Sequence, residues 1–189
     1  MPYSSEHKQV TRGRIIECAR ELFNLRGFTE VTVGEIMSAA GLTHGGFYNH
    51  FKSKDELYIE AVQANGKCDS IDYSFEGIEL AEQVINSYTS KAHLENVEGH
   101  CPMIALPSDI ARSGREVRQA YESSLVKMVS IFENLSNKKG SKESRQKAIS
   151  IAALCVGGMV MARTVENKDL AEEIRQAALV TATELAHKN

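Results

Sequence analysis

Hydrophobic residues recur along almost the whole chain at the three- and four-residue spacing that is typical of amphipathic helices. In the first predicted helix, one face carries the apolar residues Ile15, Ile16, Ala19, Leu22 and Phe23. No run of alternating Val, Ile and Thr residues indicates a strand, and the whole chain contains only three prolines. The pattern therefore predicts an all-α fold of about nine helices.

Glycines and capping signals divide the N-terminal third of the chain into short helices. The first helix is expected to end at Gly27, and TVGE (residues 32–35) is a capping box that starts a second helix. Gly41 ends this second helix, and Thr43 is expected to cap a third, which runs to about His50. Two short helices joined by a tight turn are the helix-turn-helix pattern.

Longer helices follow. They are expected over about residues 53–67, 77–91, 113–135, 143–165 and 168–187. The capping boxes SKDE and SGRE open the first and the third of these helices. Between the second and the third, Pro102 and Pro107 predict a kinked segment, because proline cannot continue a regular helix.

The segment THGGFYNH (residues 43–50) places two glycines at the start of a helix. Each glycine costs a helix interior about 1 kcal/mol relative to alanine, so we expect another molecule's backbone to come close there. The second helix of a helix-turn-helix enters the major groove, and helix N-termini attract phosphate. Tyr48 and His50 are expected to face the sugar-phosphate strands, because Phe47 and Phe51 fill the apolar i, i+4 stripe.

The run ARELFNLRGFTEVTVGEIMSAAGLTHGGFYNHFKSKDELY (residues 19–58) resembles the DNA-binding domain of the tetracycline-repressor (TetR/AcrR) family. The shared features are the LF…GF end of the first helix, T-x-x-x-I, the AGL turn, G-x-x-Y-x-H-F and K-x-x-L. The resemblance implies a cytoplasmic bacterial transcriptional regulator that binds operator DNA as a homodimer. It also implies that the protein is a repressor, released by a small-molecule effector, and not an enzyme.

The resemblance assigns the residues that are expected to contact DNA. They are Thr32, Thr43, His44, Gly45, Gly46, Tyr48, Asn49, His50 and Lys54. Gly34 departs from the family pattern, in which alanine or a polar residue is more usual, and it should weaken the second helix. The expected domains are a helix-turn-helix DNA-binding domain over residues 1–52 and an all-helical ligand-binding and dimerisation domain over residues 53–189.

The second domain is expected to bind a small, apolar molecule between its central helices. The candidate pocket residues are Tyr88, Met103, Leu106, Tyr121, Leu125 and Met128. The stretch HCPMIALPSDIA (residues 100–111) resembles the GC-x-x-x-x-L-x-x-(E/D)-(I/V)-A segment of one branch of the family, and Pro107 within it is expected to reshape the pocket wall.

The stretch AALCVGGMVMA (residues 152–162) is rich in small residues. It predicts either a buried core helix or a close-packed dimer face, and the resemblance favours the dimer, because the last two helices of the family usually provide it. The candidate interface residues are Ala152, Ala153, Val156, Gly157 and Val160.

Charge and cysteine content narrow the class of protein. The net charge of −3 excludes a generally basic nucleic-acid coat. The four cysteines are Cys18, Cys68, Cys101 and Cys155. They form no C-x-x-C pair, which favours a reducing compartment, and the polar N-terminal segment predicts no secretory signal. The apolar run 148–162 is short for a membrane span.

Other functions remain open at this stage. His93, His100 and Cys101 fit no strong zinc signature, so no metal or cofactor is expected. Cys101 is either a buried structural thiol or the sensor of a redox- or ligand-dependent activator. An all-helical enzyme would need an activated Cys101 or His100, and Ser108 with Asp109 lacks a nucleophile-elbow context, so no catalytic residue is assigned. A pure dimerisation module is the last alternative.

Overall fold

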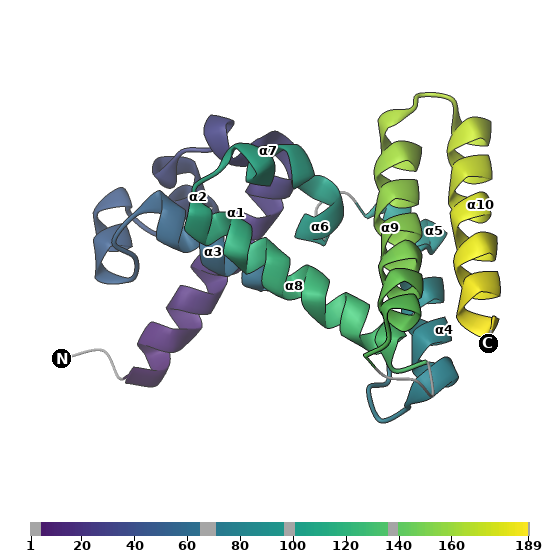
Figure 1. The fold of residues 1–189 in the computed structure, drawn as a ribbon. Helices are drawn as coiled ribbons and strands as arrows, with labels where there is room; N and C mark the ends of the chain where they lie inside the picture. The colour runs from purple at the N-terminus through teal and green to yellow at the C-terminus, as the bar shows by residue number, and fades with distance from the viewer. Residues whose placement is uncertain (1–4, 65–70, 97–100, 136–139, 189) are drawn as a thin grey trace. The chain divides into compact units, whose positions relative to one another are not determined.

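The computed structural model of the chain describes residues 5–64, 71–96, 101–135 and 140–188. Within these ranges it contains α-helices, one 3-10 helix (η1) and no strand, which confirms the all-α expectation (Figure 1). In chain order the helices are α1 (Ser5–Glu30), α2 (Val33–Ala39), η1 (His44–Asn49), α3 (Lys54–Gln63), α4 (Gly77–Tyr88), α5 (Lys91–Glu95), α6 (Pro102–Ala105), α7 (Pro107–Arg112), α8 (Arg115–Glu133), α9 (Lys142–Thr164) and α10 (Lys168–His187).

The chain forms two compact units that interleave in sequence. The first unit comprises residues 1–66 and 97–122, and the second comprises residues 67–96 and 123–189. Helices α6 and α7 therefore share a unit with α1, α2 and α3, although residues of the second unit precede them in the chain. Helix α8 begins in the first unit and ends in the second.

The core of the first unit lies between α1, α2, η1 and α3. The side chains buried there include Ile15, Phe23, Ile36, Met37, Phe47, Phe51, Leu57 and Tyr58. Phe23 meets Tyr58 edge-on with ring centroids 5.0 Å apart, and Phe28 lies 4.5 Å from Tyr58. Arg12 of α1 forms an ion pair with Glu60 of α3, so polar and apolar contacts both hold these two helices together.

The glycine stops confirm the predicted helix boundaries at the N-terminal end. Gly27 adopts a φ of +78° and interrupts α1, and Gly41 adopts a φ of +65° after α2. The predicted cap of the third helix is wrong, because Thr43 makes no side-chain capping bond and the helix it precedes is a 3-10 helix. Helix α3 ends at Gln63, before residue 67.

Two further boundaries differ from the prediction for local reasons. Helix α4 ends at Tyr88 because the Ser90 hydroxyl accepts a bond from the N–H of His93 and starts the separate helix α5. The hydroxyl of Ser113 does not cap α8 but donates to the carbonyl of Asp109, at 2.8 Å. The kinked segment is two short helices, α6 and α7, each with proline in its first turn.

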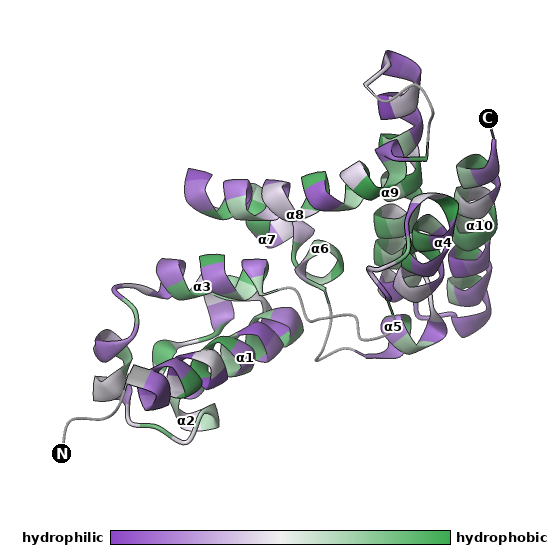
Figure 2. Ribbon diagram, turned by 90° about the horizontal axis from the view of Figure 1, so that it is seen from below, coloured by the Kyte–Doolittle hydropathy of each residue, from purple (hydrophilic) through white to green (hydrophobic). Residues whose placement is uncertain are grey.

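The second unit is built on the pair α9 and α10, with α4 packed against α10 and α5 against α9. Hydrophobic and hydrophilic residues alternate around α10, as expected of an amphipathic helix (Figure 2). Small residues let α9 and α10 approach closely, since a Cβ atom at Gly158 would lie 2.4 Å from the Cβ of Ala178. Ala152, Cys155 and Met159 are buried, so part of the small-residue stretch belongs to the core of this unit.

Helix α9 is long and apolar enough to cross a membrane by length and composition alone. Its place in the second unit accounts for the same property, because a helix that packs lengthwise against α10 needs an apolar face.

We expect Gly158→Ala to lower the free energy of unfolding by about 1–3 kcal/mol, because the added methyl group forces α9 and α10 apart. Gly13→Ala is the control, since Gly13 is an exposed helical glycine whose added Cβ atom would meet nothing within 4 Å. It should raise the free energy of unfolding by about 0.5–1 kcal/mol. Urea unfolding measures both, and equal effects would contradict the close crossing.

Candidate nucleic-acid interface

Helix α2 is held at its start by a complete capping box. The hydroxyl of Thr32 accepts a bond from the N–H of Glu35 at 3.2 Å, and the Glu35 carboxylate accepts one from the N–H of Thr32 at 2.8 Å. Bonds from Arg26 and from Thr32 lower the pKa of Glu35 to about 2, so the box stays ionised at neutral pH. The hydroxyl of Thr32, a predicted DNA contact, is therefore already engaged in the cap.

The recognition segment, which we define as residues 43–50, follows the turn at Gly41. The N–H of Leu42 donates to the carbonyl of Met37 at 2.8 Å, which folds the turn back onto α2. Most of this segment is a 3-10 helix of six residues, longer than such helices usually are. Its two glycines allow this tight winding, because they bring no side chain into the eclipsed i, i+3 positions.

The predicted DNA contacts of the recognition segment lie on its outer surface. Thr43, His44, Gly45, Tyr48 and Asn49 are exposed, while Gly46 and His50 are half-buried. Beneath this outer surface Phe47 and Phe51 are buried and stacked, with ring centroids 5.6 Å apart. Tyr48, by contrast, is 66% exposed, as the apolar spacing predicts.

Gly45 is open to its surroundings. A Cβ atom built at Gly45 would meet nothing within 4 Å, whereas one at Gly46 would lie 3.5 Å from the end of Met37. The packing of the chain therefore does not require glycine at residue 45, and its backbone conformation has a negative φ that alanine adopts. Close approach of another molecule at Gly45 stays a prediction.

His50 is the C-cap of η1, and its Nδ1 atom is buried without a hydrogen-bond partner. Burial lowers the pKa of His50, and the positive charges of Lys8 and Arg12 on α1 lower it further. The ring is therefore neutral at pH 7. A phosphate group placed beside it would favour the protonated form, since opposite charge raises the pKa of a histidine.

Lys54 has a role that the sequence does not reveal. Its ammonium group donates to the carbonyl of Phe28 and lies 4.2 Å from the centre of the Phe28 ring. Burial lowers the pKa of Lys54. The side chain thus fastens the start of α3 to the end of α1, in addition to any contact that it makes with DNA.

Asp109 of α7 holds the backbone of the same residue, Phe28, through its N–H. Its carboxylate accepts a bond from the N–H of Phe28 at 3.0 Å and one from Arg112 at 2.8 Å. A Cβ atom at Gly27 would lie 2.4 Å from the Asp109 carboxylate, so glycine is needed for this approach. Sequence reasoning missed this role of Asp109, because 81 positions separate it from Phe28.

The predicted pocket residues fall in both compact units. Met103, Leu106 and Tyr121 belong to the first unit, and Tyr88, Leu125 and Met128 belong to the second. Within the first unit the structure brings two of them together, since the Tyr121 hydroxyl donates to the carbonyl of Met103 at 3.4 Å. All six are buried or half-buried.

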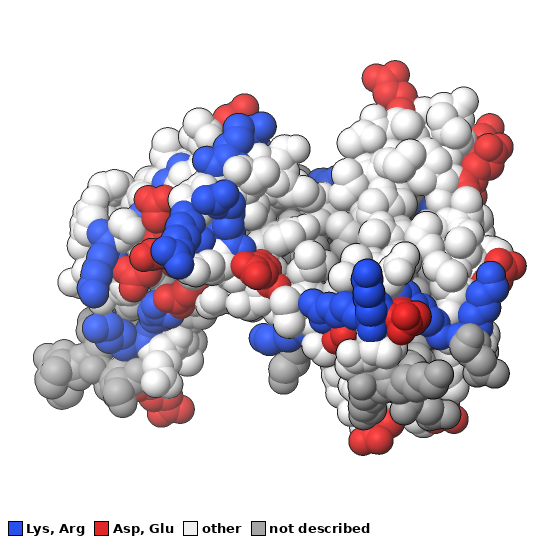
Figure 3. Space-filling model, in the orientation of Figure 1, with Lys and Arg blue, Asp and Glu red and all other residues white. Residues whose placement is uncertain are grey.

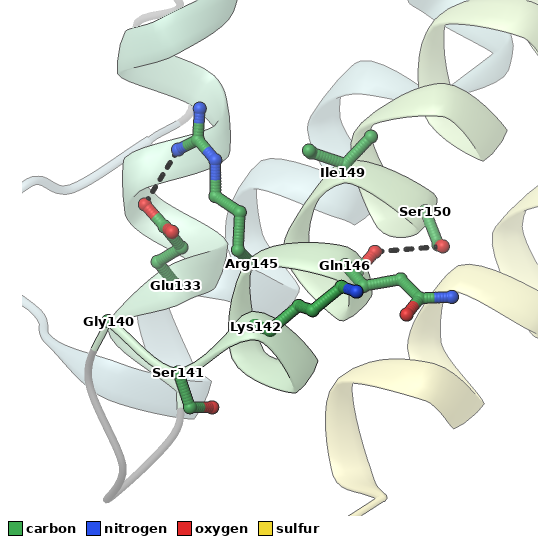
Figure 4. A pocket seen from close by; sticks show the side chains of 8 residues that line it. All are labelled: Glu133, Gly140, Ser141, Lys142, Arg145, Gln146, Ile149 and Ser150. Carbon is green, nitrogen blue, oxygen red and sulfur yellow. Dashed lines mark hydrogen bonds and ion pairs between the residues drawn. The ribbon is translucent and has the colours of Figure 1, made fainter.

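A surface groove of about 620 Å³ lies in the second unit, where α8 ends and α9 begins (Figure 4). The lining residues are Glu133, Gly140, Ser141, Lys142, Arg145, Gln146, Ile149 and Ser150. Arg145 reaches across to Glu133 at 2.9 Å, so the groove contains an ion pair. None of the six predicted pocket residues lines this groove.

The candidate dimer residues differ in exposure. Ala152 is buried, Val156, Gly157 and Val160 are half-buried, and Ala153 is exposed. Larger apolar side chains of the same two helices are also exposed, namely Ile149, Met161, Leu170 and Val180. Figure 3 shows that the surface over the upper part of α9 and α10 is largely uncharged, whereas Lys, Arg, Asp and Glu side chains intermix over the unit that holds α1 to α3.

The cysteines and histidines form no obvious reactive centre. Among the described residues, no group of three His, Cys, Asp or Glu side chains is placed to hold a metal ion, and His100 and Cys68 lie outside those residues. Burial raises the pKa of Cys155 to about 12, which makes this thiol unreactive. Cys101 is half-buried at the start of α6.

Comparisons with known proteins agree with this geometry. The family described as bacterial regulatory proteins of the tetR family matches residues 15–61, which span most of α1 to α3. The HTH-type transcriptional regulator LmrA of Bacillus subtilis (strain 168) is 27% identical over 169 residues, which cover 83% of this chain and 88% of LmrA. AcrR of Shigella flexneri is 40% identical over 57 residues, 30% of this chain and 26% of AcrR.

The fold as a whole also has solved counterparts. A TetR transcriptional regulator from Chloroflexus aurantiacus J-10-FL superimposes with a TM-score of 0.77 and 20% identity, and the match covers 95% of this chain and 97% of that one. At this identity the likeness establishes the fold, including helices beyond the DNA-binding segment.

We expect Gly45→Ala to leave the free energy of unfolding unchanged or to raise it by up to about 1 kcal/mol, because the added methyl group meets no neighbour. The same change should weaken DNA binding roughly tenfold or more, because the methyl group occupies the space that DNA needs. Fluorescence anisotropy with a bound duplex measures the affinity. Gly13→Ala should leave it unchanged, and an unaltered affinity of Gly45→Ala would contradict close approach.

We expect Gly27→Ala to lower the free energy of unfolding by about 1–3 kcal/mol, because alanine is strained at positive φ and its Cβ atom displaces the Asp109 carboxylate. Asp109→Ala alone should cost about 1–3 kcal/mol by leaving the N–H of Phe28 without its acceptor. Combined, the two changes should cost less than their sum, since each breaks the same contact. Additive losses in urea unfolding would show that the contact is not shared.

Proposed function

Because the chain belongs to the tetR family of bacterial regulatory proteins, we propose that it is a repressor that leaves its operator when a small molecule binds. The chain is a DNA-binding transcriptional regulator. We further propose that it represses transcription, that a small molecule releases it, and that its residues have the roles given below. We place DNA binding in residues 1–52, and effector binding and dimerisation in residues 53–189.

The observation that carries the proposal is the continuous outer surface of the recognition segment. Thr43, His44, Gly45, Tyr48 and Asn49 are exposed along one short helix whose buried side is anchored by aromatic packing. Such a rigidly backed, outward-facing helix is the element that enters the major groove in helix-turn-helix proteins. We assign base contacts to the first residues of the segment, together with close backbone approach at both glycines, Gly45 and Gly46.

Phosphate contacts would position the protein without reading sequence. We assign them to Thr32, Tyr48, His50 and Lys54. Lys54 suits this role although it already holds the carbonyl of Phe28, because an ammonium group has three donors and needs only one for that bond. A phosphate there would also offset the cost of a cation in the first turn of α3.

We propose that the protein acts as a homodimer through α9 and α10. Ile149, Met161, Leu170 and Val180 are exposed apolar side chains on these helices, and exposed apolar patches mark interaction surfaces. We include in the interface Ala153, Val156, Gly157 and Val160, with Ala152 packed beneath them. A two-fold dimer presents two recognition segments to half-sites about 34–36 Å apart.

The effector would act through the segment that carries α6 and α7. We propose that Met103, Leu106 and Tyr121, three of the candidate pocket residues, line an apolar pocket within the first unit. Because Asp109 fastens α7 to the end of α1, a ligand that moves α7 also moves the helix on which the helix-turn-helix rests. DNA and effector then oppose each other by the same coupling free energy.

We place the protein in the cytoplasm, where its DNA is, and we assign it no cofactor, metal or catalytic residue. Its relatives are named transcriptional regulators, and the exposed groups of the recognition segment suit binding rather than chemistry.

Selection from a random DNA pool by the purified protein, followed by fluorescence anisotropy at two salt concentrations, tests the DNA-binding assignment. We expect salt-sensitive binding to the selected duplex that unrelated competitor DNA does not abolish. Tyr48→Ala should weaken it roughly tenfold or more, because a hydrogen bond to a charged phosphate contributes about 1.5–3 kcal/mol.

The matched control is Tyr73→Ala, since Tyr73 is as exposed as Tyr48 (64% against 66%) but belongs to the second unit. It should leave the affinity unchanged. If selection yields no preferred duplex, or if the two tyrosine variants bind alike, the assignment of the recognition segment is wrong.

A further inference from the structure

Arg163, in the last turn of α9, is a partly buried cation. Its Nη1 atom is shielded from solvent and has no hydrogen-bond partner. Burial lowers the pKa of Arg163, and no acidic group raises it again. Buried polar groups in proteins are almost always hydrogen-bonded, so a guanidinium nitrogen without an acceptor requires an explanation.

The other buried arginines of the chain show how the fold treats such a cation. Arg175 donates to Glu172 through two nitrogens, at 2.5 and 2.8 Å, and to the carbonyl of Thr89 at 2.6 Å. Arg20 donates to Glu17 at 2.5 and 3.2 Å. Each of these arginines thus has a carboxylate partner within its own helix, whereas no ion pair of Arg163 is found among the described residues.

The surroundings of Arg163 come from three elements of the second unit. Helix α5 packs against α9, and His93 of α5 is half-buried with a pKa lowered by burial and by the charge of Arg163. Nδ1 of His93 lies 2.7 Å from the carbonyl of Tyr88, at the end of α4. Because a carbonyl only accepts, Nδ1 carries the proton of the neutral ring.

Resting on the proposed function, we propose that Arg163 binds the carboxylate of the effector, which is an apolar molecule with a single negative charge. The planar guanidinium presents paired N–H donors that match the two oxygens of a carboxylate. Neutral His93 adds no second positive charge, so the site balances one negative charge and not the two of a phosphate monoester.

A measurement without ligand tests the first step. Arg163→Met keeps most of the side-chain volume and removes a partly buried charge whose Nη1 atom has no acceptor among the described residues, so the melting temperature should rise by about 2–5 °C. Arg175→Met is the matched control and should lower the melting temperature, because Glu172 and the carbonyl of Thr89 lose their donor. If Arg163→Met lowers the melting temperature as Arg175→Met does, Arg163 has a structural partner and the proposal fails.

The second measurement is the melting temperature in the presence of benzoate or octanoate. Benzamide and octanamide serve as neutral analogues, and phenyl phosphate tests whether a phosphate binds instead. Sodium chloride keeps the ionic strength equal in all samples. We expect both carboxylates to raise the melting temperature of the wild-type protein, and of Arg145→Met, an ion-paired residue of the same helix. The amides should have no effect, and Arg163→Met should not respond. The proposal is overturned if no carboxylate gives a shift that depends on Arg163, if the amides act equally, or if phenyl phosphate acts more strongly.

The affinity for the selected duplex, measured with and without carboxylates, distinguishes a failure of this proposal from a failure of the proposed function. Carboxylates that stabilise the wild-type protein should also weaken its binding to that duplex several-fold, with no such effect on Arg163→Met. If no duplex is ever selected, the regulator assignment fails while the melting temperatures still decide the carboxylate site. If the duplex binds but carboxylates stabilise the protein without weakening that binding, Arg163 binds an anion that is not the effector, which overturns the proposal.

Discussion

The structure of the DNA-binding unit depends on the backbone of Phe28. Asp109 accepts from the N–H of Phe28 and Lys54 donates to its carbonyl, so α7 and α3, which are far apart in sequence, both hold this one residue. Only a residue without a Cβ atom permits this approach at residue 27. The ring of Phe28 also packs against Tyr58 of α3. Through the contacts of Phe28, α1, α3 and α7 share one hydrophobic core.

The recognition segment is less constrained than the body that supports it. Its buried side is anchored by Phe47 and Phe51, yet its backbone winds as a 3-10 helix, and Thr43 makes no capping bond. The hydrogen-bond geometry of a 3-10 helix is poorer than that of an α-helix. Contacts with DNA would supply partners for polar groups that the segment exposes.

The arginines of the chain differ in whether a carboxylate of the same helix pairs with them. Arg20 and Arg175 each pair with a glutamate three residues earlier, and in both cases the bonds lower the pKa of the carboxylate. Where the fold alone requires a buried cation, a partner is thus supplied from the same helix. Arg163 differs, because its Nη1 atom is shielded from solvent and has no acceptor among the described residues, and it lies within residues 53–189, to which we assign effector binding.

The sequence by itself determined the all-helical class, the capping box of α2, the glycine stops and the outward direction of Tyr48, because each follows from contacts within a few residues. It also carried the family resemblance through closely spaced motifs. Only the tertiary structure decided that Lys54 and Asp109 meet at Phe28, that α7 joins the DNA-binding unit, and that Nη1 of Arg163 has no acceptor among the described residues. These facts depend on residues brought together from distant positions by packing, and no local pattern of spacing, charge or hydrophobicity records which distant side chains will meet.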